Sequence, residues 1–198
     1  MPPKIQIPKE KILDTALELV IREGHQSVTI KRLASELGCS TQPISWTFGS
    51  MENFRGELVL HGLEWVRARM CPAGDNPLRR FIRSGRIYLD IAFDAPNLLR
   101  FLHASRSRTK VRSVLDASPE GLKSLASALA EDAGISRERA MVFFTSMVIY
   151  IQGLVSILLD GNTGYSRDTA RSLLREQGIA CLVYAGIEME RASALLGE

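Results

Sequence analysis

Residues 28–54 read VTIKRLASELGCSTQPISWTFGSMENF, and this stretch decides the fold. Thr29 is suited to cap a short helix over residues 30–37, and Gly38 is suited to end it. Ser40 then starts a second short helix that runs to about residue 47. Two short helices joined by a tight turn form a helix-turn-helix motif, whose second helix enters the major groove of DNA.

The side chains of this stretch divide into an apolar set, spaced to form a small core, and an outward set. Ala34 is small enough for the two helices to cross closely, and Gly38 is free to take a positive φ. The outward set of the second helix is uncharged: Thr41, Gln42, Ser45, Trp46 and Thr47. Glutamine pairs with adenine, serine and threonine bond bases or phosphates, and tryptophan contacts a thymine methyl group or a sugar.

The predicted DNA interface consists of this outward set and four neighbours: Thr29, Lys31, Ser40 and Ser50. Trp46 has an alternative role, because large aromatic side chains are usually buried and it would then pack against a neighbouring helix.

The remainder of the chain has helical periodicity and no alternating strand of useful length. Further helices are expected over residues 9–23, 51–69, 78–93, 96–105, 119–132, 137–159 and 167–195. The chain is therefore predicted to be all-α, with a helix-turn-helix DNA-binding domain over residues 1–60 and a larger effector-binding and dimerising bundle over residues 61–198.

Residues 140–159 are 20 positions without a charge, about the length that spans a bilayer. On a helical projection, small and polar residues fall on one stripe and large apolar residues cover the opposite face. A membrane anchor has no need of such a stripe, so a buried helix of a soluble protein is favoured over a membrane span.

The net charge is small, since 25 Lys and Arg stand against 22 Asp and Glu and give +3. Residues 1–60 are balanced, with seven basic and seven acidic side chains, whereas residues 67–112 carry eleven basic and three acidic ones. Net charge therefore does not by itself identify a nucleic-acid partner. The arginines over residues 79–112 form either a solvated face or a surface for an anion.

The sequence gives little support for a catalytic site or a metal site. The three cysteines, Cys39, Cys71 and Cys181, are far apart and form no C-x-x-C pair, so neither a disulfide framework nor a zinc site is indicated. The histidines are dispersed, and no phosphate loop or HExxH motif is present. We therefore expect a cytoplasmic protein without catalytic residues, cofactor or metal.

Residues 9–58 resemble the DNA-binding domain of TetR-family transcriptional regulators. The matching positions are Ile12, Leu13, Ala16, Leu19 and Gly24 in the first helix, Thr29, Ile30, Leu33 and Ala34 in the second, Gly38 and Ser40 at the turn, and Phe48, Ser50, Glu52 and Phe54 after the recognition helix. The resemblance implies a ligand-responsive repressor that binds a palindromic operator as a homodimer. It also implies a small effector in the C-terminal domain and dimerisation through the last two long helices, here 137–159 and 167–195.

Two positions depart from the family pattern. Ser45 stands where the family usually has a phosphate-contacting tyrosine, and Met51 stands where it usually has a lysine. Both departures remove phosphate contacts, which supply the sequence-independent part of DNA affinity. Lys4, Lys9 and Lys11 could compensate as an N-terminal arm. The alternative function is a dimeric helical ligand-binding or scaffold protein in which DNA binding is weakened or lost.

Aromatic and thioether side chains in the C-terminal region are candidates for the wall of an effector pocket. The proposed ligand-binding residues are Phe93, Phe101, Phe143, Met147 and Tyr150. The same residues at helical spacing also fit an ordinary core, which is the default for any one of them. In a regulator of this kind, the effector would shift the helix over 51–69 and change the spacing of the two recognition helices.

Overall fold

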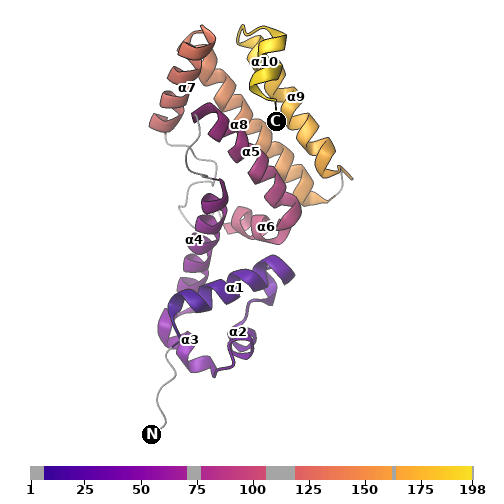
Figure 1. Cartoon of the computed structure of the whole chain (residues 1–198). Helices are drawn as coiled ribbons and strands as arrows, with labels where there is room; N and C mark the ends of the chain where they lie inside the picture. The colour runs from indigo at the N-terminus through magenta and orange to yellow at the C-terminus, as the bar shows by residue number, and fades with distance from the viewer. Residues whose placement is uncertain (1–6, 71–76, 106–118, 162–163, 198) are drawn as a thin grey trace. The chain divides into compact units, whose positions relative to one another are not determined.

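The computed structural model describes residues 7–70, 77–105, 119–161 and 164–197, and within these ranges it is all-α and contains no strand (Figure 1). The chain divides into two compact units. Unit 1 comprises Met1–Arg67 and Asp94–Val114, and unit 2 comprises Ala68–Phe93 and Leu115–Glu198. The predicted all-α class is confirmed.

Unit 1 is built around the first helix of the chain. Its elements are α1 (Lys9–Glu23), the short 3₁₀ helix η1 (His25–Ser27), α2 (Ile30–Glu36), α3 (Thr41–Phe48), α6 (Pro96–Ser105) and α4 (Met51–Met70) as far as Arg67. The apolar face of α1 is buried through Ile12, Leu13, Ala16, Leu17, Leu19 and Val20, as its four-residue recurrence predicts. Phe48 and Phe54 meet edge to face at 5.0 Å between ring centroids and join α3 to α4.

Helix α6 packs on α1 within unit 1, although it lies far along the sequence. Asn97 Nδ2 donates a hydrogen bond to the carbonyl oxygen of Ile21 at 3.3 Å, and Phe101 stacks on His25 with ring centroids 5.7 Å apart. α4 and α6 also approach closely, because a Cβ atom at Gly62 would lie 3.2 Å from a methyl carbon of Leu98. Unit 1 is thus completed by α6, which follows the helix-turn-helix in the sequence only after α4 and α5.

Unit 2 is a helical bundle in which α8 lies between α7 and α9 (Figure 1). Its elements are α5 (Pro77–Asp94) as far as Phe93, α7 (Pro119–Ala133), α8 (Arg137–Asp160), α9 (Arg167–Tyr184) and α10 (Met189–Leu195). The buried face of α8 consists of Ala140, Phe143, Phe144, Met147, Ile151, Leu154, Val155 and Leu159. Its opposite face is exposed in the single chain and carries Val142, Ile149 and Ile157.

Helix α8 is the one helix of the described residues that is long and apolar enough to cross a membrane. Core helices of soluble proteins meet the same criteria of length and composition, and one face of α8, which carries Phe143, Phe144 and Met147, is buried in unit 2. The two faces of α8 are those that the helical projection separates, with large apolar residues on one and mainly small or polar residues on the other.

The predicted single helix over residues 167–195 is wrong. The chain forms α9 and α10 instead, because Gly186 takes a φ of 101° between them. The amide of Ile187 donates to the carbonyl oxygen of Leu182 at 3.1 Å, which closes the end of α9. Arg139 of α8 donates to the carbonyl oxygen of Ala185 at 3.3 Å and supports the same turn.

Candidate nucleic-acid interface

The turn between α2 and α3 has the geometry that its sequence predicts. Thr29 caps α2, since its hydroxyl oxygen accepts a hydrogen bond from the amide of Arg32 at 3.2 Å. Gly38 takes a φ of 63°, and the amide of Cys39 donates to the carbonyl oxygen of Ala34 at 2.9 Å. α3 then begins at Thr41, so the second helix of the motif is fixed relative to the first by backbone hydrogen bonds.

Helix α3 presents an uncharged outer face. Ile44 and Phe48 are buried, whereas all five predicted outward residues are exposed: Thr41, Gln42, Ser45, Trp46 and Thr47. The side chain of Trp46 is 64% exposed, so Trp46 is not a core residue and the packing alternative does not hold in the single chain. The other predicted DNA-binding residues, Thr29, Lys31, Ser40 and Ser50, are exposed as well.

Two hydroxyl groups on α3 bond to their own helix. Ser45 Oγ donates to the carbonyl oxygen of Thr41 at 3.2 Å, and Thr47 Oγ1 donates to that of Pro43 at 2.8 Å. Their protons are therefore directed at the backbone, and their remaining lone pairs face outward as hydrogen-bond acceptors. Acceptors of this kind suit the amino groups that adenine and cytosine present in the major groove.

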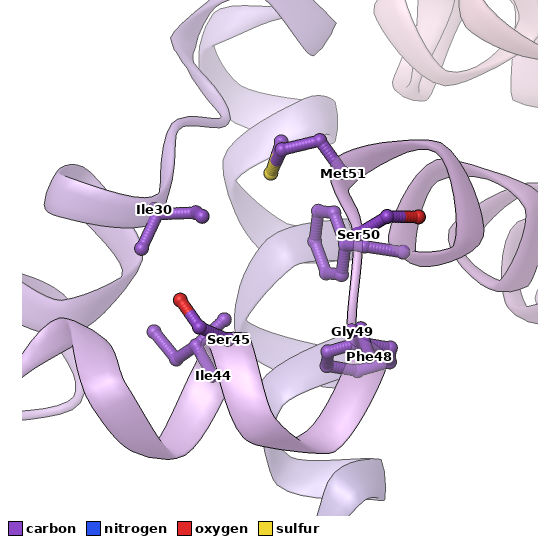
Figure 2. A pocket seen from close by; sticks show the side chains of 8 residues that line it. Ile30, Ile44, Ser45, Phe48, Gly49, Ser50 and Met51 are labelled. Carbon is purple, nitrogen blue, oxygen red and sulfur yellow. The ribbon is translucent and has the colours of Figure 1, made fainter.

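A hollow of about 100 Å³ separates the C-terminal half of α3 from the start of α4 (Figure 2). It is lined by Ile30, Ile44, Ser45, Phe48, Gly49, Ser50, Met51 and Phe54. Ser45 and Met51, the two departures from the family pattern, line it from α3 and from the start of α4 respectively (Figure 2). The small side chain of Ser45 and the uncharged thioether of Met51 therefore leave this hollow open and mainly apolar.

The turn from α3 to α4 is held by polar side chains. Gly49 takes a φ of 70°, and its amide donates to the carbonyl oxygen of Ser45 at 2.9 Å. Ser50 Oγ accepts from the amide of Asn53 at 3.1 Å, while Asn53 Nδ2 donates to the carbonyl oxygen of Phe48 at 3.2 Å. The role of Asn53 was not predicted from the sequence, although its position three residues after Ser50, an N-cap residue type, is the available signal.

A network of four charges fixes the end of α1 against α2. Arg32 lies 2.9 Å from Glu36 and 3.2 Å from Glu23, and Arg22 lies 2.8 Å from Glu23 and 3.3 Å from Glu36. The hydrogen bond that Arg22 donates to Glu23, reinforced by the charges of both carboxylates, raises the pKa of Arg22. The ion pairs of Arg32 therefore join α2 to the end of α1. Sequence reasoning missed this network, although the i, i+4 spacing of Arg32 and Glu36 is a signal for part of it.

The predicted N-terminal arm is not formed by Lys9 and Lys11, because both lie in the first turn of α1. Lys9 forms an ion pair with Glu57 of α4 and lies 5.8 Å from the ring centroid of Phe48. It therefore joins α1 to α4 and α3. Lys4 lies outside the described residues. Lys31 on α2 is exposed and forms no ion pair with another described residue.

The proposed ligand-binding residues are distributed over both units. Phe143 and Met147 lie one turn apart on the buried face of α8, Tyr150 is half-buried on the same helix, and Phe93 lies on α5 beneath the guanidinium of Arg167. Burial, the charge of Glu176 and the neighbouring Tyr165 raise the pKa of Tyr150. Phe101 lies in unit 1. The structure therefore brings Phe143 and Met147 together in one core and places Phe101 in the other unit.

The part of the chain that the structure describes contains no cluster of side chains that could bind a metal ion. Three His, Cys, Asp or Glu side chains with metal-ligand geometry are not found there. Cys39 and Cys181 are both half-buried free thiols.

The fold and this surface define the class: an all-α protein with a helix-turn-helix near its N-terminus, whose second helix presents an exposed, uncharged face. A family model described as bacterial regulatory proteins, tetR family, matches residues 12–58. Residues 12–58 therefore match the DNA-binding domain of the TetR family of transcriptional regulators, as the sequence motifs predict.

Solved structures show the same fold along most of the chain. A transcriptional regulator from Rhodococcus sp. Rha1 is 14% identical, with a TM-score of 0.65 over 90% of this chain and 98% of that chain. A tetR-family regulator from Streptomyces coelicolor is 16% identical, with a TM-score of 0.63 over 96% and 89%. A TetR variant from Acinetobacter baumannii AYE in complex with minocycline is 15% identical, with a TM-score of 0.55 over 96% and 94%. A comparison with curated protein sequences gave no match.

Proposed function

We propose that this transcriptional regulator is a cytoplasmic, ligand-responsive repressor that binds a palindromic operator as a homodimer. The observation that carries the proposal is the outer face of α3. Five uncharged side chains, including a largely exposed tryptophan, project from this face of a helix-turn-helix whose inner residues are buried. Residues 1–60 would form the DNA-binding domain, and residues 61–198 the effector-binding and dimerising domain. The proposal assigns no catalytic role, because a repressor acts by binding.

The exposed face of α8 supports the homodimer. Val142 and Ile149 are 51% and 67% exposed, and Ile157 continues the same stripe two turns later. Residues 140–159 of this helix contain no charged side chain, so the stripe is unusual for a surface exposed to water. Tyr184 at the end of α9 is 83% exposed beside it. Since α9 ends at Tyr184, the proposed interface uses α8 and α9 and does not depend on a helix that reaches residue 195.

A groove of about 590 Å³ runs between the start of α8 and the end of α9. It is lined by Glu138, Arg139, Val142, Phe143, Ser146, Gln177, Ala180, Cys181, Tyr184 and Ala185. A two-fold interface places the same patch of each protomer against its partner, so in the proposed dimer the exposed Tyr184 of each protomer lies against the groove of the other. Two recognition helices related by that axis would read half-sites about one helical turn of DNA apart, near 34 Å.

The effector is inferred from the fold and from the aromatic core of unit 2. The TetR variant with a similar fold was crystallised with minocycline, so we infer that a small molecule also binds to this chain. The proposed wall is formed by Phe93, Phe143, Met147 and Tyr150 of unit 2. Phe101 is left out of this wall because it stacks on His25 within unit 1.

A salt titration tests DNA binding together with one departure from the family pattern, Met51. The purified protein should bind DNA flanking its own gene saturably and in a sequence-dependent way, with a shallow dependence of affinity on salt. Met51→Lys should tighten binding and steepen the salt slope by about one per protomer, because a lysine at the start of α4 adds a phosphate contact. Leu60→Lys, a matched change at an exposed position farther along α4, should alter the slope less. No saturable, sequence-dependent binding at low salt would contradict the repressor and favour the scaffold alternative.

Trp46→Ala tests the reading face directly. Operator affinity is expected to fall about 5- to 150-fold, the range of about 1–3 kcal/mol for a good base contact, with an unchanged melting temperature because Trp46 is exposed. Fluorescence anisotropy of labelled operator and thermal unfolding followed by circular dichroism measure the two effects. A lower melting temperature with unchanged DNA affinity would show that Trp46 packs and does not read DNA.

A further inference from the structure

Gln42 and Trp46 occupy the centre of the exposed face of α3. Successive residues of a helix are turned by about 100°, so these two, one turn apart, lie opposite the buried pair Ile44 and Phe48. Side chains four residues apart on a helix have Cβ atoms about 5–6 Å apart. Neighbouring base pairs are stacked about 3.4 Å apart. The two side chains can therefore contact one base pair or two neighbouring ones.

The exposed side chain of Gln42 ends in a hydrogen-bond donor and an acceptor. Adenine presents an acceptor at N7 and a donor at N6 in the major groove, so the amide group matches both. Guanine presents two acceptors there, N7 and O6, and the amide oxygen of Gln42 would face one of them without a hydrogen between. Gln42 therefore favours an A·T pair over a G·C pair.

The remainder of α3 is poorly suited to guanine. The helix carries no lysine or arginine, the side chains that most often bind guanine O6 and N7. Ser45 Oγ and Thr47 Oγ1 donate their protons to carbonyl oxygens of their own helix, so both present acceptors to the outside. Acceptors suit the amino groups of adenine and cytosine, so these hydroxyl groups disfavour guanine without separating adenine from cytosine.

Trp46 supplies the apolar contact that separates thymine from cytosine. Its side chain is 64% exposed, so a large apolar surface lies on the face that would enter the groove. Thymine is the one base of the four that presents a methyl group in the major groove. Contact with the indole removes this methyl group from water, and cytosine offers no equivalent group. Trp46 therefore favours the same A·T pairs as Gln42.

We propose that α3 reads adjacent A·T pairs, with Gln42 on an adenine and Trp46 on the methyl group of a thymine in the same or the next pair. An A·T pair carries both groups on one major-groove edge, so the preferences of the two side chains reinforce each other. The inference rests on the operator binding proposed above and names the bases that it requires. It assigns no base to Lys31, which lies on α2.

The test uses the full chain and an operator selected from a pool of random-sequence duplexes. Each thymine of the half-sites is replaced in turn by uracil, which lacks only the methyl group, and affinity is measured by fluorescence anisotropy. At the thymine that Trp46 contacts, affinity is expected to fall about 4-fold for one half-site and about 15-fold for both, as for the loss of one buried methyl group in each. Uracil outside the half-sites should have no effect. Unchanged affinity with uracil at every thymine of the half-sites would overturn the inference.

Two variants assign the contacts to their side chains. Trp46→Ala should bind the thymine and uracil operators equally, whereas Leu60→Ala, at an exposed apolar position of α4, should keep the difference. A difference that survives in Trp46→Ala would overturn the role of Trp46. Replacement of adenine by 7-deazaadenine, which lacks the N7 acceptor, should weaken binding of the native chain and leave that of Gln42→Ala unchanged. Equal weakening of both would overturn the role of Gln42.

The selection separates this inference from the function on which it rests. If the pool yields no preferred sequence, operator binding fails and the inference fails with it. If the pool yields an operator whose half-sites contain no adjacent A·T pairs, the repressor stands and only the inference about α3 is overturned.

Discussion

Replacement of Ile149 by arginine is expected to convert the proposed dimer into a monomer and to lower operator affinity by at least about 100-fold. Ile149 is 67% exposed at the centre of the uncharged stripe on α8, so the folded single chain tolerates a long polar side chain there. In a two-fold interface the substitution is made on both protomers and buries two unpaired charges. Two half-sites bound by separate monomers lose the effective concentration that links them, which is the source of the large fall in affinity.

Light scattering coupled to size exclusion measures the oligomeric state, and anisotropy with an intact palindrome measures the affinity. Leu60→Arg is the matched control, because Leu60 is an exposed apolar residue of α4 in unit 1. It should remain dimeric and should bind the operator at least as tightly as the native chain. If Ile149→Arg stays dimeric, the α8 stripe is not the interface, and a monomeric variant with full operator affinity would show that DNA binding does not need the dimer.

Most helix boundaries follow from the sequence because their causes are local. Thr29, Ser136 and Ser166 each accept a hydrogen bond from the amide three residues later, and each directly precedes the first residue of a helix that the sequence predicts. A capping interaction needs only a few consecutive residues, so nothing distant in the chain can override it easily. The predicted ends of these helices accordingly lie within one residue of the observed ends, except where α9 stops.

The end of α9 was missed because the apolar pattern runs through Gly186 and because part of what fixes the turn there lies elsewhere in the chain. Apolar residues continue past the break, and Ala185, Ile187 and Ala192 are all buried, so the helical pattern does not change at Gly186. The position that a Cβ atom would take at Gly186 lies 2.8 Å from Arg139 Nη1, on α8. A glycine inside a periodic pattern does not reveal that a distant arginine occupies the space beside it.

The candidate DNA-binding site divides in the same way. Exposure along α3 follows from its periodicity, and the five outward residues were identified from the sequence. The roles of Lys9 and Arg32 were not, since Lys9 pairs with Glu57 on another helix and Arg32 reaches back to Glu23. Likewise, a run of arginines over residues 79–112 indicates positive charge, but only the fold places Arg86 against the carbonyl oxygen of Leu196.

Replacement of Phe144 by alanine is expected to lower the free energy of unfolding by about 3–5 kcal/mol, the usual cost of truncating a buried phenylalanine. Phe144 has no exposed surface and packs edge to face against Phe81 at 4.7 Å and against Phe143 at 5.1 Å between ring centroids. Phe81 lies on α5, so the substitution loosens the attachment of α5 to α8 as well as opening a cavity. The aromatic contacts contribute beyond the area that they bury.

Urea unfolding followed by circular dichroism, at one fixed protein concentration, measures this effect, because dimerisation makes apparent stability depend on concentration. Phe144→Leu keeps most of the volume and should cost about 1.5 kcal/mol or less. Trp46→Ala removes an exposed aromatic side chain and should change stability by about 0.5 kcal/mol at most. This order, a large loss for Phe144→Ala and a small one for Trp46→Ala, follows from burial alone. A loss below about 1 kcal/mol for Phe144→Ala would show that the aromatic cluster is loose enough to collapse around the missing ring, as the wall of an adaptable effector pocket would.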